Sequence, residues 1–374
     1  SFGKGDSLRV NLYLGQMTAF LLVLSLVIGA AGIIITPGIL RLMKTPSDVS
    51  VYAAPYMRII FAGLPFMFLT VVQQFAYQGI GNGIVPLAVQ GVSVLLNVIL
   101  DPLFIFGLGR FPAMGVAGAA WATIIARSIA AGISMWLLVS GSRGLKLKLS
   151  AMRPKRKELG FLIRIGLPSA LGQSTTALGF TVLQGVINSF GTPVIAAFGI
   201  ANRLIGLFNM PAMGVGQATA ALVGQSLGAN RPDEAKRTVH MALISVFVFL
   251  MVTMSFSFFF GNQFTRFFVD DPEVIRYGAQ LFRVVSVSVV FFGMFMVYNG
   301  VFQGAGYTKV GMILGITRLW GIRLPLALLI GRGLGFGASG IWWAMFISNL
   351  AVYLAALVMY RRETWMTALK SEEV

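Results

Sequence analysis

The amino-acid sequence contains ten apolar runs, each long enough to cross the hydrocarbon core of a lipid bilayer. They cover residues 14–40, 52–80, 85–108, 114–140, 161–189, 194–227, 239–260, 274–304, 310–330 and 336–360. Hydrophobic residues make up 57% of the chain and charged residues 11%, which leaves too little polar surface to cover a water-soluble globule of 374 residues. We therefore predict an all-α, polytopic membrane protein with about ten transmembrane helices.

Short motifs recur along the chain and indicate two related halves. SFG at 1–3 recurs as SLG at 226–228, QGIG at 78–81 as QGAG at 303–306, and GVAGAAWA at 115–122 as GASGIWWA at 337–344. The first two pairs are 225 residues apart and the third 222. Residues 160–224 have no counterpart after Ser1, so we expect roughly 65 preceding residues that would supply two further helices and complete a six-plus-six arrangement.

The repeat and the charge distribution divide the chain into four parts. We predict a four-helix N-lobe at 1–140, a basic cytoplasmic linker at 141–159, a six-helix C-lobe at 160–360 and a cytoplasmic tail at 361–374. With that topology, 17 basic residues lie on the cytoplasmic side and seven on the other side. This bias matches the positive-inside rule and favours a cytoplasmic carboxyl terminus.

Several functional classes are disfavoured by the composition. There is no cysteine, so neither a disulfide nor a thiolate metal site is expected, and the single histidine, His240, suits a membrane interface. The net charge of +17 is spread along helix ends, which suits anionic lipid and not nucleic acid. Without a catalytic pair inside the apolar runs, we expect no enzyme, no metal and no cofactor.

Asp101 is the one acidic residue, among twelve, that lies well inside an apolar run. A carboxylate at that depth costs roughly 2.5–3.5 kcal/mol to insert, which makes it a functional candidate. Asn97 lies one helical turn earlier on the same face, and Pro102 frees a backbone carbonyl at the same level. The pattern predicts a site that takes up a proton or helps to coordinate a cation. The alternative is a polar residue at a proline break near the outer interface, while an ion pair with Arg127 is disfavoured by that residue's position toward the opposite side.

Four segments together resemble the MATE family of multidrug and toxic-compound exporters, and most closely its DinF-like branch. They are the run from Ala218 to Ala229, the SFG motif, the Asp101-Pro102-Leu103 step and the GVAGAAWA block. The resemblance implies two six-helix lobes related by a pseudo-twofold axis, of which this chain lacks the first helix and most of the second. It also implies a monomer in the plasma membrane that exports small organic molecules in exchange for protons or sodium ions.

The resemblance further implies that Asn97, Asp101 and Thr123 form the cation site of the first lobe. A partner acid on the family's first helix would precede Ser1. In the second half, residues 165–190 offer only neutral polar groups, and Leu324 stands where the repeat would place the equivalent of Asp101. Ion coupling through that half is therefore disfavoured. We expect its intramembrane arginines to bind backbone carbonyls or to reach toward an interface, and these are Arg203, Arg283, Arg318 and Arg323.

Substrate contacts are predicted from two segments rich in phenylalanine and methionine, 208–213 and 291–298. Such walls are adaptable and their aromatic faces attract organic cations, although ordinary helix packing explains them equally well. The candidate cavity residues are Met213, Phe295, Gln73, Gln74, Gln217 and Asn299. A flippase for lipids or polysaccharide precursors is the alternative function, which a groove lined by cationic residues would favour.

Overall fold

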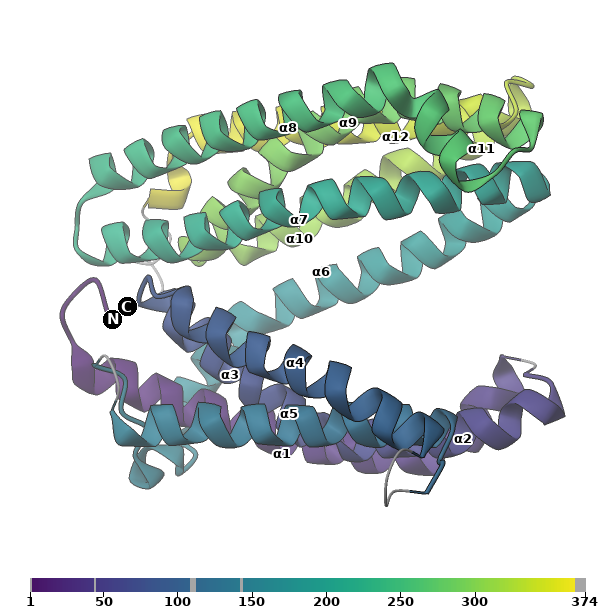
Figure 1. The fold of residues 1–374 in the computed structure, drawn as a ribbon. Helices are drawn as coiled ribbons and strands as arrows, with labels where there is room; N and C mark the ends of the chain where they lie inside the picture. Colours follow the sequence, from purple (N-terminus) through teal and green to yellow (C-terminus); the bar gives the residue numbers. More distant parts are fainter. Residues whose placement is uncertain (1, 44, 108–111, 142–143, 367–374) are drawn as a thin grey trace. The chain divides into compact units, whose positions relative to one another are not determined.

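The computed structural model describes residues 2–43, 45–107, 112–141 and 144–366, and the regular structure in these ranges is entirely helical (Figure 1). Ser1, the end of the predicted 85–108 run, linker residues 142–143 and tail residues 367–374 lie outside the described part. The chain forms two compact units, Ser1–Leu162 and Ile163–Val374. The boundary between the units falls within one long helix, α6 (Arg156–Asn188).

The described part of the first unit contains five long helices and one short 3-10 turn. They are α1 (Ser7–Leu42), α2 (Ser47–Ala62), α3 (Leu64–Gly79), α4 (Ile84–Phe106), α5 (Val116–Ser140) and η2 (Leu149–Met152). Helix α5 packs against α2, α3 and α4, whereas α1 packs against α2, α3 and η2. The candidate acid Asp101 therefore lies on a helix whose main neighbour is α5.

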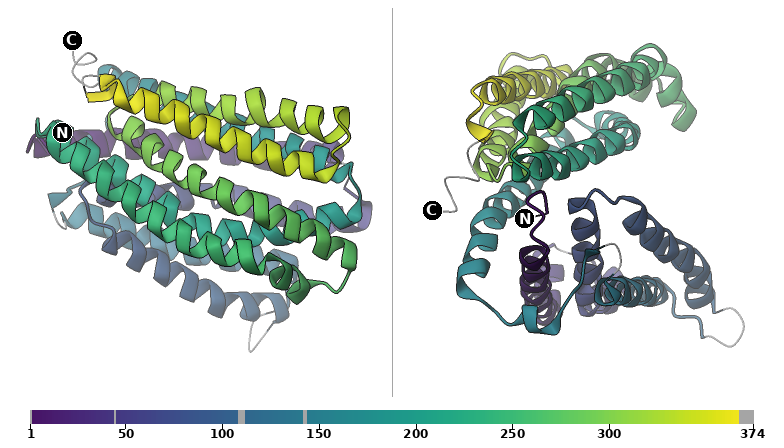
Figure 2. Two further views of the ribbon diagram at one scale, coloured as in Figure 1. Left: turned by 90° about the horizontal axis from the view of Figure 1, so that it is seen from above. Right: turned by 90° about the vertical axis from the view of Figure 1, so that its left-hand side faces the viewer.

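The second unit is built around α9 (Pro272–Gly304), which packs against α7, α8 and α12 (Figures 1 and 2). In the most apolar stretch of α9, 61% of the residues are buried, against 17–39% in the other membrane-length helices. The remaining elements are α7 (Thr192–Gly228), α8 (Pro232–Phe268), α10 (Thr308–Ile316), η3 (Thr317–Arg323), α11 (Leu324–Leu328), η4 (Leu329–Gly333), α12 (Ala338–Arg361) and η5 (Thr364–Met366).

The predicted all-α membrane fold is confirmed. Within the described residues, eight helices are long and apolar enough to cross a membrane, and α2 with α3 form a ninth candidate span. Helix α6 also has sufficient length but is less apolar, because it carries the polar cluster Gln173 to Thr176 and, further on, Gln184. These elements together correspond to the ten apolar runs of the sequence.

The run at 52–80, expected to be one helix, is instead two helices bent by 46° at Gly63. Two local features account for the break. Pro65 has no backbone N–H to continue the helical ladder. In addition, a Cβ on Gly63 would overlap the side chain of Ile124, so the missing side chain lets α5 approach the bend closely.

The internal repeat is visible in the backbone of both units. Helices α1 and α8 begin 225 residues apart, and the α2–α3 pair covers 47–79 where α9 covers 272–304. Gly115 and Gly337 precede α5 and α12 with nearly the same backbone angles, φ 56° and ψ −130° against φ 60° and ψ −141°. Since residues other than glycine rarely adopt such angles, the glycine of each repeated motif is explained by its conformation.

Candidate functional site

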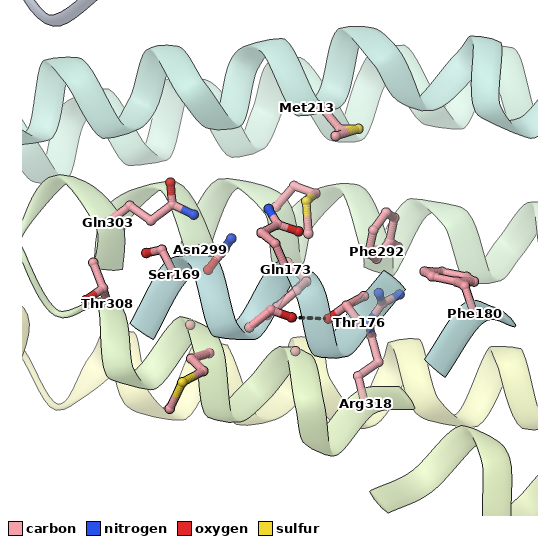
Figure 3. A pocket seen from close by; sticks show the side chains of 16 residues that line it. Ser169, Gln173, Thr176, Phe180, Met213, Phe292, Asn299, Gln303, Thr308 and Arg318 are labelled. Carbon is pink, nitrogen blue, oxygen red and sulfur yellow. Dashed lines mark hydrogen bonds between the residues drawn. The ribbon is translucent and has the colours of Figure 1, made fainter. Parts of the chain in front are cut away.

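A cavity of about 280 Å³ lies within the second unit, between α6, α7, α9, α10 and the start of η3 (Figure 3). Two hydrogen bonds hold α6 against the segment 308–323, which also contributes to the cavity wall. Thr308 Oγ1 donates to Ile165 O at 3.0 Å, and Trp320 Nε1 donates to Thr175 O at 2.9 Å. The cavity is thus framed by contacts between segments more than 140 residues apart in the sequence.

The cavity wall changes character from one end to the other. Figure 3 shows Ser169, Gln303 and Thr308 at one end, and the aromatic rings of Phe180 and Phe292 around Arg318 at the other. Gln173, Thr176, Met213, Phe295, Met296 and Asn299 also line the cavity. Apart from Arg318 these side chains are uncharged, so the wall combines neutral hydrogen-bonding groups with apolar surface and a single positive charge.

Arg318 belongs to a buried polar network with Arg323 and Asn349. The Arg318 side chain is 5% exposed and that of Arg323 is 2% exposed. Both arginines donate to Asn349 Oδ1, Arg323 from Nη2 at 2.6 Å and Arg318 from Nη1 at 3.3 Å. Arg323 Nε also donates to Ser348 Oγ at 2.9 Å, while Asn349 Nδ2 donates to Ser288 Oγ at 2.8 Å. The network therefore joins η3 to α12 and α9.

Aromatic rings complete the surroundings of the two guanidinium groups. The Cζ atom of Arg318 lies 4.5 Å from the ring centre of Phe292 and 5.9 Å from that of Phe180. Arg323 Cζ lies 6.0 Å from the same Phe180 ring. Cation–π attraction partly replaces the hydration that burial removes from these groups.

The π-helical geometry of η3 explains how two residues five apart in sequence reach one acceptor. In an α-helix, with 3.6 residues per turn, residues i and i+5 point about 140° apart. In a π-helix, hydrogen bonds link residues i and i+5, so both side chains can reach the same side, as Arg318 and Arg323 do. The sequence prediction that these arginines bind backbone carbonyls or reach toward an interface was wrong, because their acceptors are the buried side chains of Asn349 and Ser348.

In the first unit the structure joins the two polar residues predicted on α4. Asn97 Nδ2 donates to Asp101 Oδ1 at 3.1 Å, and both residues are half-buried. Arg127 Nη1 donates to Gln90 Oε1 at 3.0 Å, and none of the ion pairs found in the described part joins it to Asp101. Thr123 lies on α5, where its hydroxyl donates to Ala119 O at 2.9 Å.

The six predicted cavity residues lie in different places. Met213, Phe295 and Asn299 line the cavity of the second unit. Gln217 is an exposed residue of α7 and is not part of the wall. Gln73 and Gln74 belong to α3 of the first unit, where Gln73 is buried and its Nε2 has no hydrogen-bond partner among the described residues. The polar wall residues Gln173, Thr176 and Gln303 were not among the predicted contacts. Gln173 and Thr176 belong to the polar cluster 173–176 of α6, which was the available signal for this part of the wall.

The described residues contain no group of three or more histidine, cysteine, aspartate or glutamate side chains that could hold a metal ion. The Asn97–Asp101 pair remains the candidate position for a coupling ion, and the cavity the candidate position for an organic molecule. The MatE family model matches residues 1–103 and 168–329, which is more than half of the chain. This chain belongs to the MatE family.

Curated relatives agree with the MatE assignment. The chain is 26% identical to the probable multidrug resistance protein YoeA of Bacillus subtilis, over 98% of this chain and 79% of that protein. It is 25% identical to the FAD transporter of Shewanella oneidensis, over 96% of this chain and 79% of that protein. As predicted from the sequence, this MatE protein is a multi-pass membrane transporter and not an enzyme.

Solved structures show the same fold. A crystal structure of MATE in the bent conformation has a TM-score of 0.86 at 23% sequence identity, and the match covers 99% of this chain and 86% of that one. An outward-facing MATE transporter has a TM-score of 0.84 at 24% identity, with the same shares covered. The MATE-type fold that the resemblance implied is therefore confirmed.

Proposed function

We propose that this MatE protein exports small organic molecules across the plasma membrane by alternating access, in exchange for protons or sodium ions. The observation that carries the proposal is the cavity of the second unit. It lies among membrane-length helices and combines apolar walls with convergent neutral polar groups, the usual composition of a small-molecule site. Methionine and phenylalanine in that wall adapt to ligands of different shape.

The coupling ion is assigned in this proposal to Asn97 and Asp101 on α4, with Thr123 on α5 as a further oxygen ligand. The amide of Asn97 already donates to the carboxylate, which orients Asp101 Oδ1. Binding of a cation to that carboxylate changes the charge of α4 within the membrane. To drive transport, the ion must bind the inward-open and outward-open states with different affinities.

The preference of the cavity for a charged or neutral substrate depends on which aromatic faces are not already covered by a protein side chain. The sequence suggested cationic substrates because aromatic faces attract cations. In the structure, however, the face of Phe292 is covered by the guanidinium of Arg318 at 4.5 Å. Phe295 and Met213 therefore suit the apolar body of a substrate better than they suit its positive charge.

The proposed topology places the carboxyl terminus in the cytoplasm. Lys236 Nζ at the start of α8 donates to Glu363 Oε1, just after α12, so these two helix ends lie on the same side. Both belong to segments that the positive-inside rule assigns to the cytoplasm. We expect the protein to act as a monomer in contact with anionic lipid.

A flippase for lipids or polysaccharide precursors is a second candidate, favoured by the positive charge of Arg318 in the cavity wall. Phosphate groups of such precursors would suit a guanidinium. The two functions differ in their substrate, which one reconstitution experiment can separate. A flippase moves a fluorescent phospholipid between leaflets, whereas an exporter moves a soluble dye.

The test is dye efflux from sealed proteoliposomes under an imposed proton or sodium gradient. We expect the wild-type protein to export a soluble xanthene dye when one of the two gradients is present. Asp101→Asn should abolish the gradient dependence while the protein still inserts, because the amide keeps an acceptor for Asn97 but removes the charge. Asp270→Asn, at an exposed acid between α8 and α9, is the matched control and should behave as wild type. Unchanged gradient-driven efflux in Asp101→Asn would refute the coupling role.

A further inference from the structure

Arg318 and Arg323, the buried arginines of the second unit, have no acidic partner among the residues that the structure describes. The ion pairs found in the described part join Arg9 to Asp6, Arg231 to Glu234 and Lys236 to Glu363. The sequence explains why: residues 159–232, 235–269 and 274–362 contain no aspartate or glutamate. Apart from Glu158 and Glu273 in the first turns of α6 and α9, the helices that surround the cavity can therefore supply only neutral acceptors to Arg318 and Arg323.

Arg318 is the less satisfied of the two guanidinium groups. A guanidinium carries five N–H donors, and among the described residues Arg318 makes a single hydrogen bond, from Nη1 to Asn349 Oδ1. Its Nε is buried and has no partner there. Arg323 differs, because it donates to both Asn349 and Ser348 and is not part of the cavity wall.

Buried cations without an acidic partner are costly, so they are retained where a counter-charge arrives with a ligand or where a network holds them. The network explains Arg323, whose Nε and Nη2 both have side-chain acceptors. It explains Arg318 only in part, because this side chain reaches the cavity with donors that no described residue accepts (Figure 3). Phe292 and Phe180 hold the guanidinium in position from the side.

We propose that the Arg318 end of the cavity binds an anionic group, a carboxylate or a phosphate carried by a small organic molecule. The planar guanidinium matches either group with two parallel hydrogen bonds. Arg323, behind Arg318 on the shared acceptor Asn349, adds a second positive charge. Gln173 supplies an amide donor in the same wall, whereas the Thr176 hydroxyl already donates to Gly172 O at 2.7 Å. The apolar body of the ligand contacts Phe292 and Phe295.

The internal repeat gives this assignment an independent argument. An offset of 223 residues matches Asp101 of α4 to Leu324, which directly follows Arg323. The equivalent helices of the two units thus carry opposite charges at equivalent depth, an acid in the first and arginines in the second. This division separates a site for a coupling cation from a site for an anionic substrate. As a statement about the substrate, the inference rests on the proposed transport function.

The test compares two dyes that share one ring system but differ in charge. Carboxyfluorescein is anionic at neutral pH, whereas rhodamine 123 is cationic. Fluorescence polarisation with detergent-purified protein measures the binding of each dye without requiring transport. We expect carboxyfluorescein to bind more tightly than rhodamine 123. Arg318→Gln should weaken carboxyfluorescein binding by about tenfold or more, since hydrogen bonds to charged groups are worth that much.

Two further variants test whether the effect is specific to the guanidinium group of Arg318. Arg318→Lys keeps the charge but loses the planar fork, so we expect intermediate affinity for carboxyfluorescein. Arg283→Gln removes one positive charge from an exposed position of α9 outside the cavity, and it should bind both dyes as wild type. Rhodamine 123 binding should be unchanged or stronger in Arg318→Gln. Equal loss of both dyes in Arg318→Gln, or unchanged carboxyfluorescein binding, would overturn the proposal.

Competition identifies the source of the anionic group. Phenyl phosphate and benzoate should displace carboxyfluorescein, as expected for a site that accepts small organic anions. Displacement by short-chain phosphatidylglycerol alone would overturn the proposal in favour of a lipid headgroup. The same two dyes, tested in the efflux assay, distinguish a failure of the proposed transport function from a failure of the proposed anion site. Anion binding without gradient-driven efflux would refute the transport function alone, and efflux of rhodamine 123 without anion binding would refute the anion site alone.

Discussion

Arg323 Nη2 donates a hydrogen bond to Asn349 Oδ1 at 2.6 Å, deep inside the second unit. The same oxygen also accepts from Arg318, and the amide nitrogen of Asn349 reaches Ser288 of α9. One neutral side chain therefore holds two like charges close together and fixes the position of α12 against η3. The cavity wall depends on this contact, because Arg318 is both a wall residue and a member of the network.

Replacement of Asn349 by leucine should lower the stability of the protein by about 3 kcal/mol, because two buried guanidinium groups lose their shared acceptor. Denaturant unfolding in detergent measures the change. Asn188→Leu makes the same chemical substitution at an exposed position of α6 and should leave stability nearly unchanged. A loss of equal size in both variants would show that the buried network does not stabilise the unit.

A larger residue at Gly315 should block the cavity. Gly315 lines the wall, and a Cβ there would meet only Thr176 Oγ1 at 3.7 Å, so the position has room for a side chain. We expect Gly315→Leu to reduce dye efflux by about tenfold or more with normal folding, since the substrate must then fit around the added side chain. Gly199→Leu, at an open position of α7, is the control. Wild-type efflux in Gly315→Leu would place the transport path elsewhere.

Most of the helical framework could be predicted from the sequence, because each apolar run of membrane length has few ways to satisfy its backbone other than as a helix. The break at Gly63 was not predicted, although Pro65 was a signal for it, and it also depends on how closely α5 approaches the bend. The repeat of this run, α9, has no proline at the equivalent position and is continuous. Pro65 and tertiary packing together separate the two.

The arginine network shows a second limit of structure prediction from the sequence. The polar pair Asn97 and Asp101 was found because the residues are four apart, which an α-helix places on one face. Arg318 and Arg323 are five apart, a spacing that suggests opposite faces unless the helix is a π-helix. The complete absence of acids from residues 274–362 was the available signal that their partners would be neutral.

Gly300 should be intolerant of a side chain. A Cβ at this residue of α9 would overlap the carbonyl oxygen of Gly216 on α7, and backbone atoms cannot move aside as a flexible side chain can. We expect Gly300→Ala to destabilise the protein by about 1–3 kcal/mol through overpacking. Gly199→Ala has open space around its Cβ and should be neutral or stabilising. Thermal unfolding of both variants distinguishes close helix packing from a general effect of losing glycine.

The side chain of Gln16 should hold the linker that follows α5 in place and protect it from proteolysis. This buried side chain of α1 donates to Ala151 O at 2.7 Å and to Arg153 O at 2.6 Å, and it accepts from Lys155 N at 2.9 Å. Gln16→Ala removes all three hydrogen bonds, so we expect faster tryptic cleavage after Lys155. Gln263→Ala, at an exposed glutamine of α8, is the control. Equal cleavage rates in both would show that the linker is held by other contacts.

The central claim, that the cavity of the second unit is the substrate site and alternates its access, can be tested by cysteine labelling, since the chain contains no cysteine. Thr176→Cys places one thiol in the cavity wall, and Leu183→Cys places one in the buried core of the same unit. Sealed vesicles of one orientation are treated with a membrane-impermeant maleimide. We predict that labelling of Thr176→Cys changes when the ion gradient is reversed and falls when carboxyfluorescein is present, while Leu183→Cys stays unlabelled. Labelling of Thr176→Cys that responds to neither the gradient nor the dye would contradict the account.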